Sequence, residues 1–219
     1  MDDDKVAVIS CSLGGFDAQP KHVEQSIKAD YFYFNDENFP LRPSMTPRLQ
    51  AKVPKMFGWQ LKPDYDYYLW LDGNMTMNNP DFLKYFLKEI GSCEMAVIKH
   101  HRRDTIKWET RYLERALNEQ SKYMVARYEN EQWKEQLDVI QADDDFDDDW
   151  LFIGGVFMYR NTKIVQKALT EWWYHVSRYC IQDQISMPYM MKDLKVKVLD
   201  HDYTKWDFIT YKRHGKRES

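Results

Sequence analysis

The chain has 219 residues, a length that suits one compact α/β domain better than two. Hydrophobic residues make up 43% of it, enough to build a core, and the formal net charge of −4 offers no general attraction to nucleic acid or to anionic membranes. Aromatic residues are dense at 16%, so some of them must cover surface, where they either pack or stack on sugars or bases. We expect no nucleic-acid partner.

Cysteine use and the N-terminal sequence bear on the compartment. The three cysteines, Cys11, Cys93 and Cys180, are odd in number and lack metal-ligand or redox spacing, which favours reduced thiols. The N-terminus has no basic segment followed by a long apolar one, so it does not read as a signal peptide. No window approaches the ~20 apolar residues that a membrane span needs. We expect a cytoplasmic protein without a membrane span.

Short apolar runs closed by turn residues predict six strands. The first of these runs ends in a Cys-Ser-Leu-Gly-Gly turn, the third ends in Asp72-Gly73-Asn74, and the fifth contains a pair of glycines. The six runs are residues 6–10, 31–34, 67–71, 95–98, 152–159 and 196–199.

Helical patterns separate these strands. Asn79 as N-cap and Pro80 at the first helical position predict a helix that Gly91 closes. Apolar spacing predicts another helix over 162–179, and a polar helical region lies between about 105 and 137. Strands that alternate with helices predict a single α/β domain over 1–219, Rossmann-like, with a mostly parallel central sheet flanked by helices.

The turn after the third strand is the first candidate site. In a parallel sheet, ligands bind beyond the carboxyl ends of the strands, and Asp72 and Asn74 follow such an end. Gly73 between them lets the backbone turn tightly and lets a ligand approach. Two oxygen ligands plus two phosphate oxygens would suit Mg²⁺ or Mn²⁺, which would then act as a Lewis acid on a departing diphosphate. Asp-Gly-Asn is also ordinary β-turn chemistry.

Residues around this turn carry a resemblance to a known family. The segment RLQAKVPKMFGWQLKPDYDYYLWLDGNMTM over 48–77 resembles the core of a GT-A glycosyltransferase family best known from plant mucilage and cell-wall proteins, with relatives in bacteria and large DNA viruses. Members show an Arg-x-Gln-x-Lys helix, a Tyr-Asp-Tyr-x-x-Trp-x-Asp-Gly-Asn strand, a Lys-His followed by Arg, and a late Asp-Gln pair. The matching residues here are Arg48, Gln50, Lys52, Tyr65-Asp66-Tyr67, Trp70, Asp72-Gly73-Asn74, Lys99 to Arg103, and Asp183-Gln184.

The resemblance implies a single GT-A domain that transfers a sugar from a nucleotide-sugar, expected to be a UDP-sugar, to a glycan or glycoprotein acceptor, with Mn²⁺ or Mg²⁺ as cofactor. If the source is a virus, we expect the protein in the host cytoplasm. Most GT-A enzymes carry Asp-x-Asp, whereas Asn74 ends the motif here, and a neutral amide oxygen binds a cation more weakly than a carboxylate does. His201 is a further candidate metal ligand from the late region, with His214 in reserve.

Three groups of residues are candidates for donor binding. Arg48 and Lys52, one helical turn apart, share a face that the resemblance directs toward the nucleotide. In the loop after the first strand, the backbone could receive the base and ribose, although this loop lacks the full dinucleotide-binding glycine pattern. The basic cluster that follows the fourth strand, residues 99–103, could bind the diphosphate or an acidic sugar, or could be a solvated loop. The residues of the last two groups are Ser10, Cys11, Ser12 and Gly14, and His100, Arg102 and Arg103.

The glycine pair and the late acidic residues point to the sugar. Gly154-Gly155 could admit a sugar ring, or mark a bulge with no ligand. Distantly similar family 8 retaining glycosyltransferases carry an Asp-Gln pair beside the donor sugar, and this similarity implies retention with Asp183 and Gln184 as catalytic residues. Asp183 could instead cap a helix that starts near Ile185. If the enzyme inverts, the base would be sought at Asp148, Asp149 and their neighbours. Otherwise the segment 143–149, with its six Asp, is expected to be a solvated mobile loop or an acceptor-side flap.

Two classes of function compete. One is an active glycosyltransferase; the other is a catalytically silent domain that binds a nucleotide-sugar or carbohydrate, which the Asn74 substitution keeps open. A Mg²⁺ phosphohydrolase would place its acidic motif after the first strand, where this chain has Cys-Ser-Leu-Gly-Gly.

Overall fold

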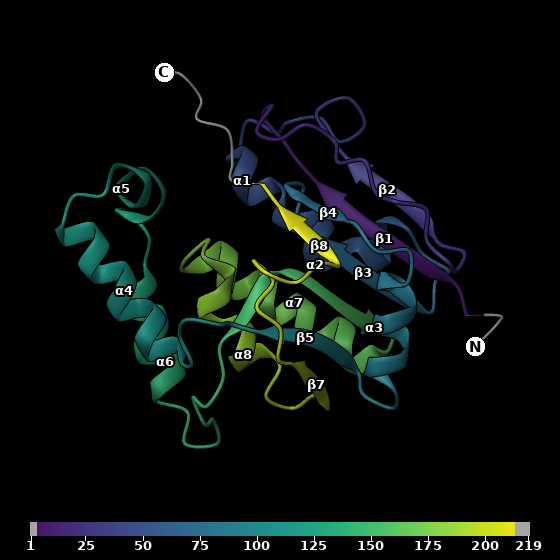
Figure 1. The fold of residues 1–219 in the computed structure, drawn as a ribbon. Coiled ribbons are helices and arrows are strands. Elements are labelled where there is room, and N and C mark those ends of the chain that lie inside the picture. The colour runs from purple at the N-terminus through teal and green to yellow at the C-terminus, as the bar shows by residue number, and fades with distance from the viewer. Residues whose placement is uncertain (1–3, 213–219) are drawn as a thin grey trace.

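The computed structural model describes residues 4–212 and is built on a six-stranded sheet in the order β2-β1-β3-β6-β5-β7 (Figure 1). Five of the strands point the same way, and β6 runs antiparallel to both of its neighbours, β3 and β5. Because β6 is reversed, its beginning lies at the edge where the other strands end. The strands are β1 (Val6–Cys11), β2 (Asp30–Phe34), β3 (Tyr67–Leu71), β5 (Met95–Lys99), β6 (Phe152–Arg160) and β7 (Val196–Leu199).

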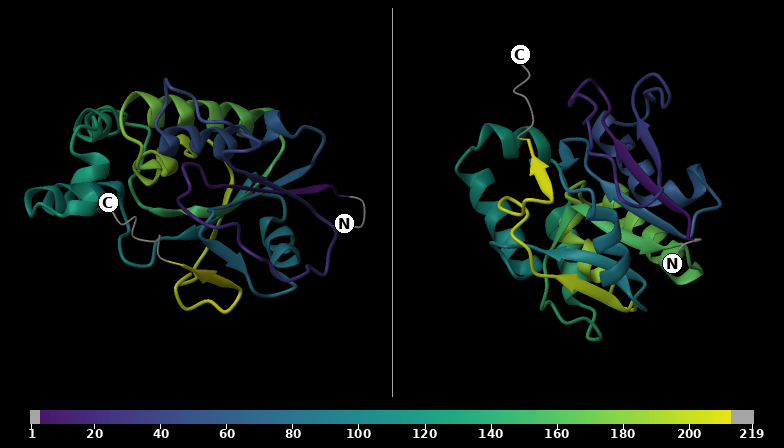
Figure 2. Two further views of the ribbon diagram at one scale, coloured as in Figure 1. Left: turned by 90° about the horizontal axis from the view of Figure 1, so that it is seen from above. Right: turned by 45° about the vertical axis from the view of Figure 1, so that its right-hand side comes forward.

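Helices cover both faces of the sheet, as the view from above shows (Figure 2). On one face lie α1 (Pro47–Gln50), α2 (Lys52–Leu61), α7 (Lys163–Arg178), a 3-10 turn η1 (Asp183–Ile185) and α8 (Met187–Met190). On the other lie α3 (Phe82–Ile90) and a small antiparallel pair of strands, β4 (Met75–Met77) and β8 (Ile209–Tyr211). These layers leave the carboxyl end of the sheet as the place where loops from both halves of the chain meet.

A third group of helices projects beyond the end of the sheet (Figure 1). It contains α4 (Ile106–Asn118), α5 (Lys122–Tyr128) and α6 (Trp133–Gln141). The N-terminus of α4 is held by two acceptors: the Thr105 hydroxyl accepts the Trp108 N–H, and the Asp148 carboxylate accepts the N–H groups of Ile106 and Lys107. Asp148 thereby ties the acidic segment to this helical group.

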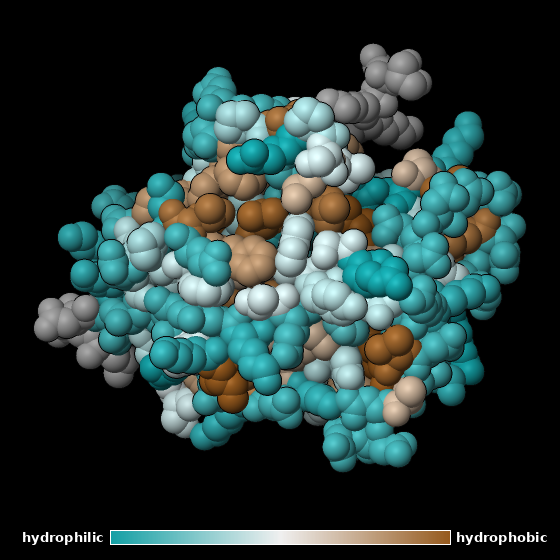
Figure 3. All heavy atoms as spheres, turned by 180° about the vertical axis from the view of Figure 1, so that it is seen from behind, coloured by the Kyte–Doolittle hydropathy of each residue, from teal (hydrophilic) through white to brown (hydrophobic). Residues whose placement is uncertain are grey.

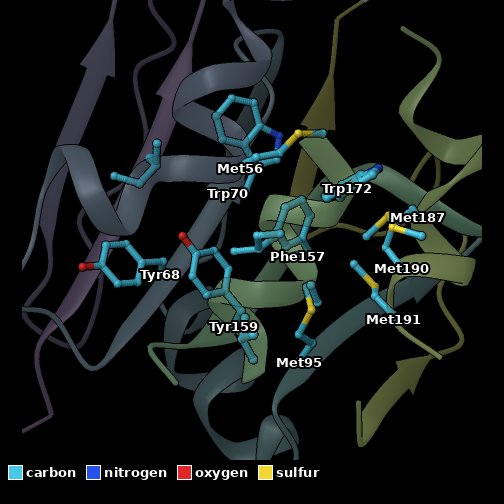
Figure 4. Packing of buried hydrophobic residues seen from close by; sticks show 14 of the residues in the cluster. Met56, Tyr68, Trp70, Met95, Phe157, Tyr159, Trp172, Met187, Met190 and Met191 are labelled. Atoms are coloured by element: carbon cyan, nitrogen blue, oxygen red, sulfur yellow. The ribbon is translucent and has the colours of Figure 1, made fainter. Parts of the chain in front are cut away.

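The core consists of two main clusters, one on each face of the sheet. In the first, Trp172 of α7 packs on Phe157 of β6, with ring centroids 5.6 Å apart, while Tyr68 and Tyr159 stack at 5.2 Å across the β3–β6 pair (Figure 4). Met56 of α2 is fully buried in the same cluster. Many aromatic residues are buried in this layer, and their packing fixes α2 and α7 against the strands that lead to the site.

Seen from behind, hydrophobic residues also reach the surface, in a band across the upper half of that face with isolated spots below it (Figure 3). Tyr174 and Ile164 of α7 are among the exposed large hydrophobic residues, at 56% and 46%. Within residues 4–212, no helix combines the length and the apolar character that crossing a bilayer requires.

The predicted fold class is confirmed: the protein is α/β and Rossmann-like, with a mostly parallel central sheet flanked by helices. All six predicted strands occur within a residue or so of their predicted limits. The helix expected to start at Pro80 begins at Phe82 instead, because the Asn79 side chain accepts the Asp81 N–H in a turn that precedes the helix. The polar region expected over 105–137 is three helices, and β4 and β8 were not foreseen.

Candidate functional site

The Asp72-Gly73 turn lies at the carboxyl end of β3, where it was predicted. One oxygen of Asp72, Oδ1, accepts the indole N–H of Trp70 at 2.8 Å and lies 3.8 Å from Lys55 Nζ, and 39% of the Asp72 side chain is exposed. A Cβ at Gly73 would lie 2.9 Å from the Cys11 carbonyl oxygen, so only glycine lets this turn pack against the end of β1. The carboxylate is thus oriented by Trp70 and open to the solvent.

Asp183 lies in the turn after α7, beside the same Lys55 ammonium as Asp72, and it is held by two lysines. Its Oδ2 lies 2.6 Å from Lys52 Nζ and 2.5 Å from Lys55 Nζ. Burial alone would raise the pKa of Asp183, but the charges and hydrogen bonds of both lysines outweigh burial and hold that pKa well below its usual range. Burial lowers the pKa of Lys52, while Asp183 opposes that shift. The group is an ionised carboxylate in an ammonium cradle.

This geometry contradicts the interpretation of Asp183 as a helix cap, and its catalytic role stays a prediction. A helix cap would require its side chain to accept a backbone N–H of the following turn, yet Gln182 is the capping residue of η1 and no side chain makes a cap hydrogen bond there. The backbone oxygen of Asp183 accepts the Trp172 indole N–H at 3.1 Å, which fixes the turn against α7. Next to it, Gln184 donates its amide to the Phe152 carbonyl at 3.1 Å.

The glycine pair of β6 lies directly against both carboxylates. A Cβ at Gly154 would lie 3.0 Å from Asp183 Oδ1 and 3.2 Å from Lys55 Nζ. A Cβ at Gly155 would displace the end of the Met75 side chain and lie 3.3 Å from Asp72 Oδ2. Side chains of the protein itself approach both glycines, which let the two carboxylates sit against the strand. The approach of a sugar ring to this pair stays a prediction.

An open pocket unites Asp72 and Asp183. Five segments form its wall: the end of β1 with the loop that follows, the start of the α1–α2 pair, the end of β3, the end of α5, and the turn after α7. Its lining residues are Cys11, Ser12, Leu13, Phe16 and Asp17; Pro47, Arg48, Ala51 and Lys52; Trp70, Asp72 and Gly73; Arg127 and Tyr128; and Ile181, Gln182, Asp183 and Gln184.

The loop after β1 contributes only in part to this pocket. Cys11 and Ser12 line it, whereas Ser10 is buried within β1 and Gly14 lines a neighbouring pocket. Gly14 has φ +72°, and its N–H is donated to the carboxylate of Asp36 at 2.9 Å. Burial, together with the charges of Asp72 and Asp36, raises the pKa of Cys11 to about 12, so this thiol is neutral.

The basic cluster after β5 is engaged within the protein. The Nδ1 atom of buried His100 accepts the N–H groups of Arg102 and Arg103 at 3.1 and 3.0 Å, and Arg103 forms an ion pair with buried Glu109. Glu109 also accepts the amide of Gln182, the neighbour of Asp183. Neither arginine of this cluster lines the Asp72 pocket. The cluster thus supports the Asp183 turn through Glu109, and its grip on a phosphate stays a prediction.

Asn74 and His201 lie apart from the Asp72 carboxylate. Asn74 is buried, donates its amide to the Lys212 carbonyl at 3.0 Å, and lines a different pocket, which shares Gly73 with the first. His201 stacks on Trp206 at 4.3 Å, and its Nε2 lies 2.6 Å from the Tyr85 hydroxyl. Their metal-binding roles remain predictions, and His214 lies outside the described residues.

The acidic segment is anchored at two points. Asp148 holds the start of α4, and Asp143 forms an ion pair with Lys192 and accepts the Tyr189 hydroxyl at 2.7 Å. Hydrogen bonds from Lys192 and Tyr189 lower the pKa of Asp143 to about 2. The side chains of Asp144, Asp145, Asp147 and Asp149 are exposed between and beyond these anchors.

Sequence reasoning missed three residues of the site. Lys55 is the most important, because it lies beside both carboxylates with only 1% of its side chain exposed. It follows Lys52 by three positions on one helix, a spacing that could have placed both lysines on one face. Arg127 and Tyr128 of α5 also line the pocket, and no motif marks them.

The side chains of the pocket could hold a divalent ion only in an open site, where most of the ligands come from substrate and water. In the described part of the chain, no group of three His, Cys, Asp or Glu side chains is close enough to bind a metal. Asp72 presents one partly exposed carboxylate to the pocket, which fits a Mg²⁺ or Mn²⁺ ion that takes most of its oxygen ligands from phosphate and water.

The sheet is mostly parallel with one reversed strand, and one pocket holds two carboxylates: Asp72 in the turn after β3, and Asp183, which two lysines hold. Together with the family match, these features define a glycosyltransferase-like α/β protein. The chain belongs to the TOD1/MUCI70 glycosyltransferase-like domain family, whose model matches residues 38–214. That match covers the site from Arg48 to Asp183 and confirms the family suggested by the sequence motifs. A search of curated proteins gave no match.

Proposed function

We propose that this protein is a metal-dependent glycosyltransferase, which takes a sugar from a nucleotide-sugar, expected to be a UDP-sugar, and transfers it to a glycan or glycoprotein acceptor with retention. The observation that carries the proposal is that Asp72 and Asp183 line one pocket, beside the same Lys55 ammonium, inside a glycosyltransferase-like domain. The donor would lie between them, with its diphosphate toward Asp72 and its sugar toward Asp183.

Each carboxylate has a separate task in this proposal. Asp72, with Trp70 fixing its orientation, would hold a Mn²⁺ or Mg²⁺ ion whose positive charge stabilises the departing diphosphate. Asp183 remains ionised because Lys52 and Lys55 compensate its charge, so it can stabilise positive charge that develops on the sugar ring. The lysine cradle also keeps this carboxylate from accepting a proton, which suits electrostatic stabilisation better than general-base catalysis.

The rest of the pocket would position the donor. Cys11 and Ser12 place the end of β1 against the Asp72 turn, where this segment would contact the nucleoside. Gln184 is fixed by the Phe152 carbonyl, and Lys52 stands between Asp183 and the pocket with 21% of its side chain exposed. These side chains are rigidly held, as a site that orients a substrate requires.

A silent binding domain is the second candidate, and one observation favours it. Lys55 Nζ already lies 3.8 Å from Asp72 and 2.5 Å from Asp183, so a protein ammonium compensates both carboxylates without a metal ion. Such an arrangement could bind a neutral sugar without activating it. The two candidates differ in whether the donor bond is ever broken.

Donor hydrolysis tests the proposal. Purified protein is incubated with a panel of UDP-sugars, with Mn²⁺ or with a chelator, and release of UDP is measured; NMR then compares the anomeric configuration of the released or transferred sugar with that of the donor. Metal-dependent release with an unchanged configuration supports the proposal. Binding of UDP-sugars without any release would establish the silent domain, and an inverted product would redirect the search for a base to Asp148 and Asp149.

A further inference from the structure

Two neighbouring arginines, Arg48 and Arg127, line the pocket and form no ion pair within residues 4–212. Arg48 of α1 places its guanidinium 5.3 Å from the Tyr128 ring centroid and donates to the Arg127 carbonyl at 3.4 Å. Arg127 of α5 places its own guanidinium 4.2 Å from the Tyr123 ring and 5.8 Å from the Phe16 ring. Throughout residues 4–212, neither arginine forms an ion pair with a carboxylate.

The two lysines of the pocket are paired with carboxylates, and the lining also holds the carboxylate of Asp17. Lys52 and Lys55 are matched by Asp183, and Lys55 also by Asp72. Glu131, whose charge acts on Arg48 from a distance, accepts the backbone N–H of Ile181 at 2.9 Å instead. The positive charge that the pocket offers to a ligand is therefore that of the two arginines.

Holding two guanidinium charges close together in a partly buried wall is unfavourable, and a bound anion would relieve their repulsion. Burial lowers the pKa of Arg48, and the charge of Arg127 lowers it further, so two like charges are held near each other in a partly dry wall. Both guanidinium groups lie over aromatic rings, and one N–H of Arg48 is taken by the Arg127 carbonyl. Arginine has five N–H donors, so others are left for a planar or tetrahedral oxyanion, which arginine binds in a bidentate manner.

We infer that Arg48 and Arg127 form an oxyanion-binding subsite of this pocket, which takes a negatively charged group of the substrate: the diphosphate of the donor or the carboxylate of an acidic sugar. The inference rests on the proposed function for the kind of substrate, and it moves the anion grip from the cluster at Arg102 and Arg103 to the α1–α5 wall. It also gives α5 a role, because Arg127 at its end lines the same pocket as the Asp72 turn.

The subsite can be tested without a metal ion. Titration calorimetry in the presence of chelator would measure the dissociation constants of UDP, uridine, inorganic pyrophosphate and D-glucuronate for the wild type, Arg48→Gln and Arg127→Gln. Arg115→Gln is the matched control, since Arg115 lies on the neighbouring helix α4 with 69% of its side chain exposed. Loss of one charge-assisted contact should weaken anion binding about tenfold or more, and leave uridine unchanged.

The two sources of the anion separate in the same titrations. Weakened UDP and pyrophosphate binding in both variants assigns the subsite to the diphosphate, and weakened glucuronate binding alone assigns it to a sugar carboxylate. Equal binding of all anions by wild type and variants, a loss no larger than that in Arg115→Gln, or no anion binding by the wild type overturns the subsite. If both variants hydrolyse the donor with an unchanged KM, the subsite is wrong and the proposed function stands. If the arginines bind anions but the wild type does not hydrolyse the donor, the subsite stands and the proposed function is wrong.

Discussion

The ammonium of Lys55 lies 2.5 Å from the carboxylate of Asp183, a residue 128 positions later in the chain, and only 1% of the Lys55 side chain is exposed. Lys52 lies on the same carboxylate oxygen at 2.6 Å. A buried ion pair contributes little relative to a well-packed apolar pair, but removing one partner leaves a charge uncompensated and is strongly destabilising. This relationship makes the site part of the protein's stability as well as of its chemistry.

We expect Lys55→Met to lower the free energy of unfolding by about 3 kcal/mol, because Asp183 keeps only the partly exposed Lys52 as a partner. Urea denaturation of Lys55→Met, Asp183→Asn and the double variant would give the coupling energy. We expect the double variant to lose at least ~1 kcal/mol less than the sum of the single variants. Lys84→Met is the control, since Lys84 is 66% exposed and its change should stay within ~0.5 kcal/mol. Strict additivity would show that Lys55 and Asp183 do not depend on each other.

Asp72→Asn should leave the fold intact and remove metal-dependent donor hydrolysis. The asparagine carbonyl can still accept the Trp70 indole N–H, and the side chain is 39% exposed, so stability should change by under ~1 kcal/mol. The measurement is UDP release with Mn²⁺, alongside the melting temperature. A variant that hydrolyses the donor as fast as the wild type would dismiss Asp72 as the anchor of the ion.

Asn74→Asp should destabilise the protein. The Asn74 amide donates to the Lys212 carbonyl, and a carboxylate in its place would set two acceptor oxygens against each other in a buried position, at a cost of about 1–3 kcal/mol. Thermal unfolding of the variant would show the loss. Unchanged melting temperature would mean that the carboxylate finds another partner, such as a bound cation, which Mn²⁺ titration would reveal.

Gly154→Ala should impair turnover more than folding. The added methyl would lie 3.0 Å from Asp183 Oδ1 and 3.2 Å from Lys55 Nζ, so the carboxylate and the ammonium must shift by a few tenths of an ångström. The comparison is with Gly91→Ala, at a positive-φ helix end with no contact closer than 3.8 Å, where only backbone strain is at issue. Normal turnover in Gly154→Ala would show that the position of Asp183 tolerates displacement.

The pH dependence of stability should carry a contribution from His100. Burial and the charge of Arg103 lower the folded-state pKa of His100 to about 4, below the ~6.5 of an unfolded chain. The unfolded state therefore binds more protons between these values, so this contribution is present above pH ~6.5 and is lost as the pH falls toward 4. Between pH 7 and pH 5 the loss should be about 2 kcal/mol. Urea unfolding at pH 7 and pH 5 gives the free energy of unfolding at each pH, and His100→Gln should reduce the difference between the two values. An equal difference in the wild type and the variant would contradict the assignment.

The sequence predicted the sheet and the Asp72 turn because both follow from local signals. Apolar runs of strand length and turn residues at their ends are visible within a few positions, and so is the position of Asp72 after β3. The reversal of β6 was not visible, because strand direction depends on which strands pair, and β6 pairs with β3 and β5 from two different parts of the chain.

The partners of each site residue were harder to predict than the residues themselves. Asp183 was singled out, yet its bond to Lys55 spans 128 positions, and nothing local in the turn indicates it. The basic cluster was recognised as charged and placed at the right strand, but Arg103 is taken up by Glu109 of α4. Arg127 carries no motif and enters the pocket only because α5 lies across it.

The sheet order has a consequence for the growing chain. Strand β6, residues Phe152–Arg160, sits between β3 and β5, so a ribosome must add more than eighty residues after β3 before the hydrogen-bonding edge of β3 finds its permanent neighbour. Every side chain of β3 is buried in the finished protein. Until β6 emerges, this apolar edge is open to pairing with other strands, so we expect the incomplete chain to need chaperones and a chain truncated before residue 160 to aggregate.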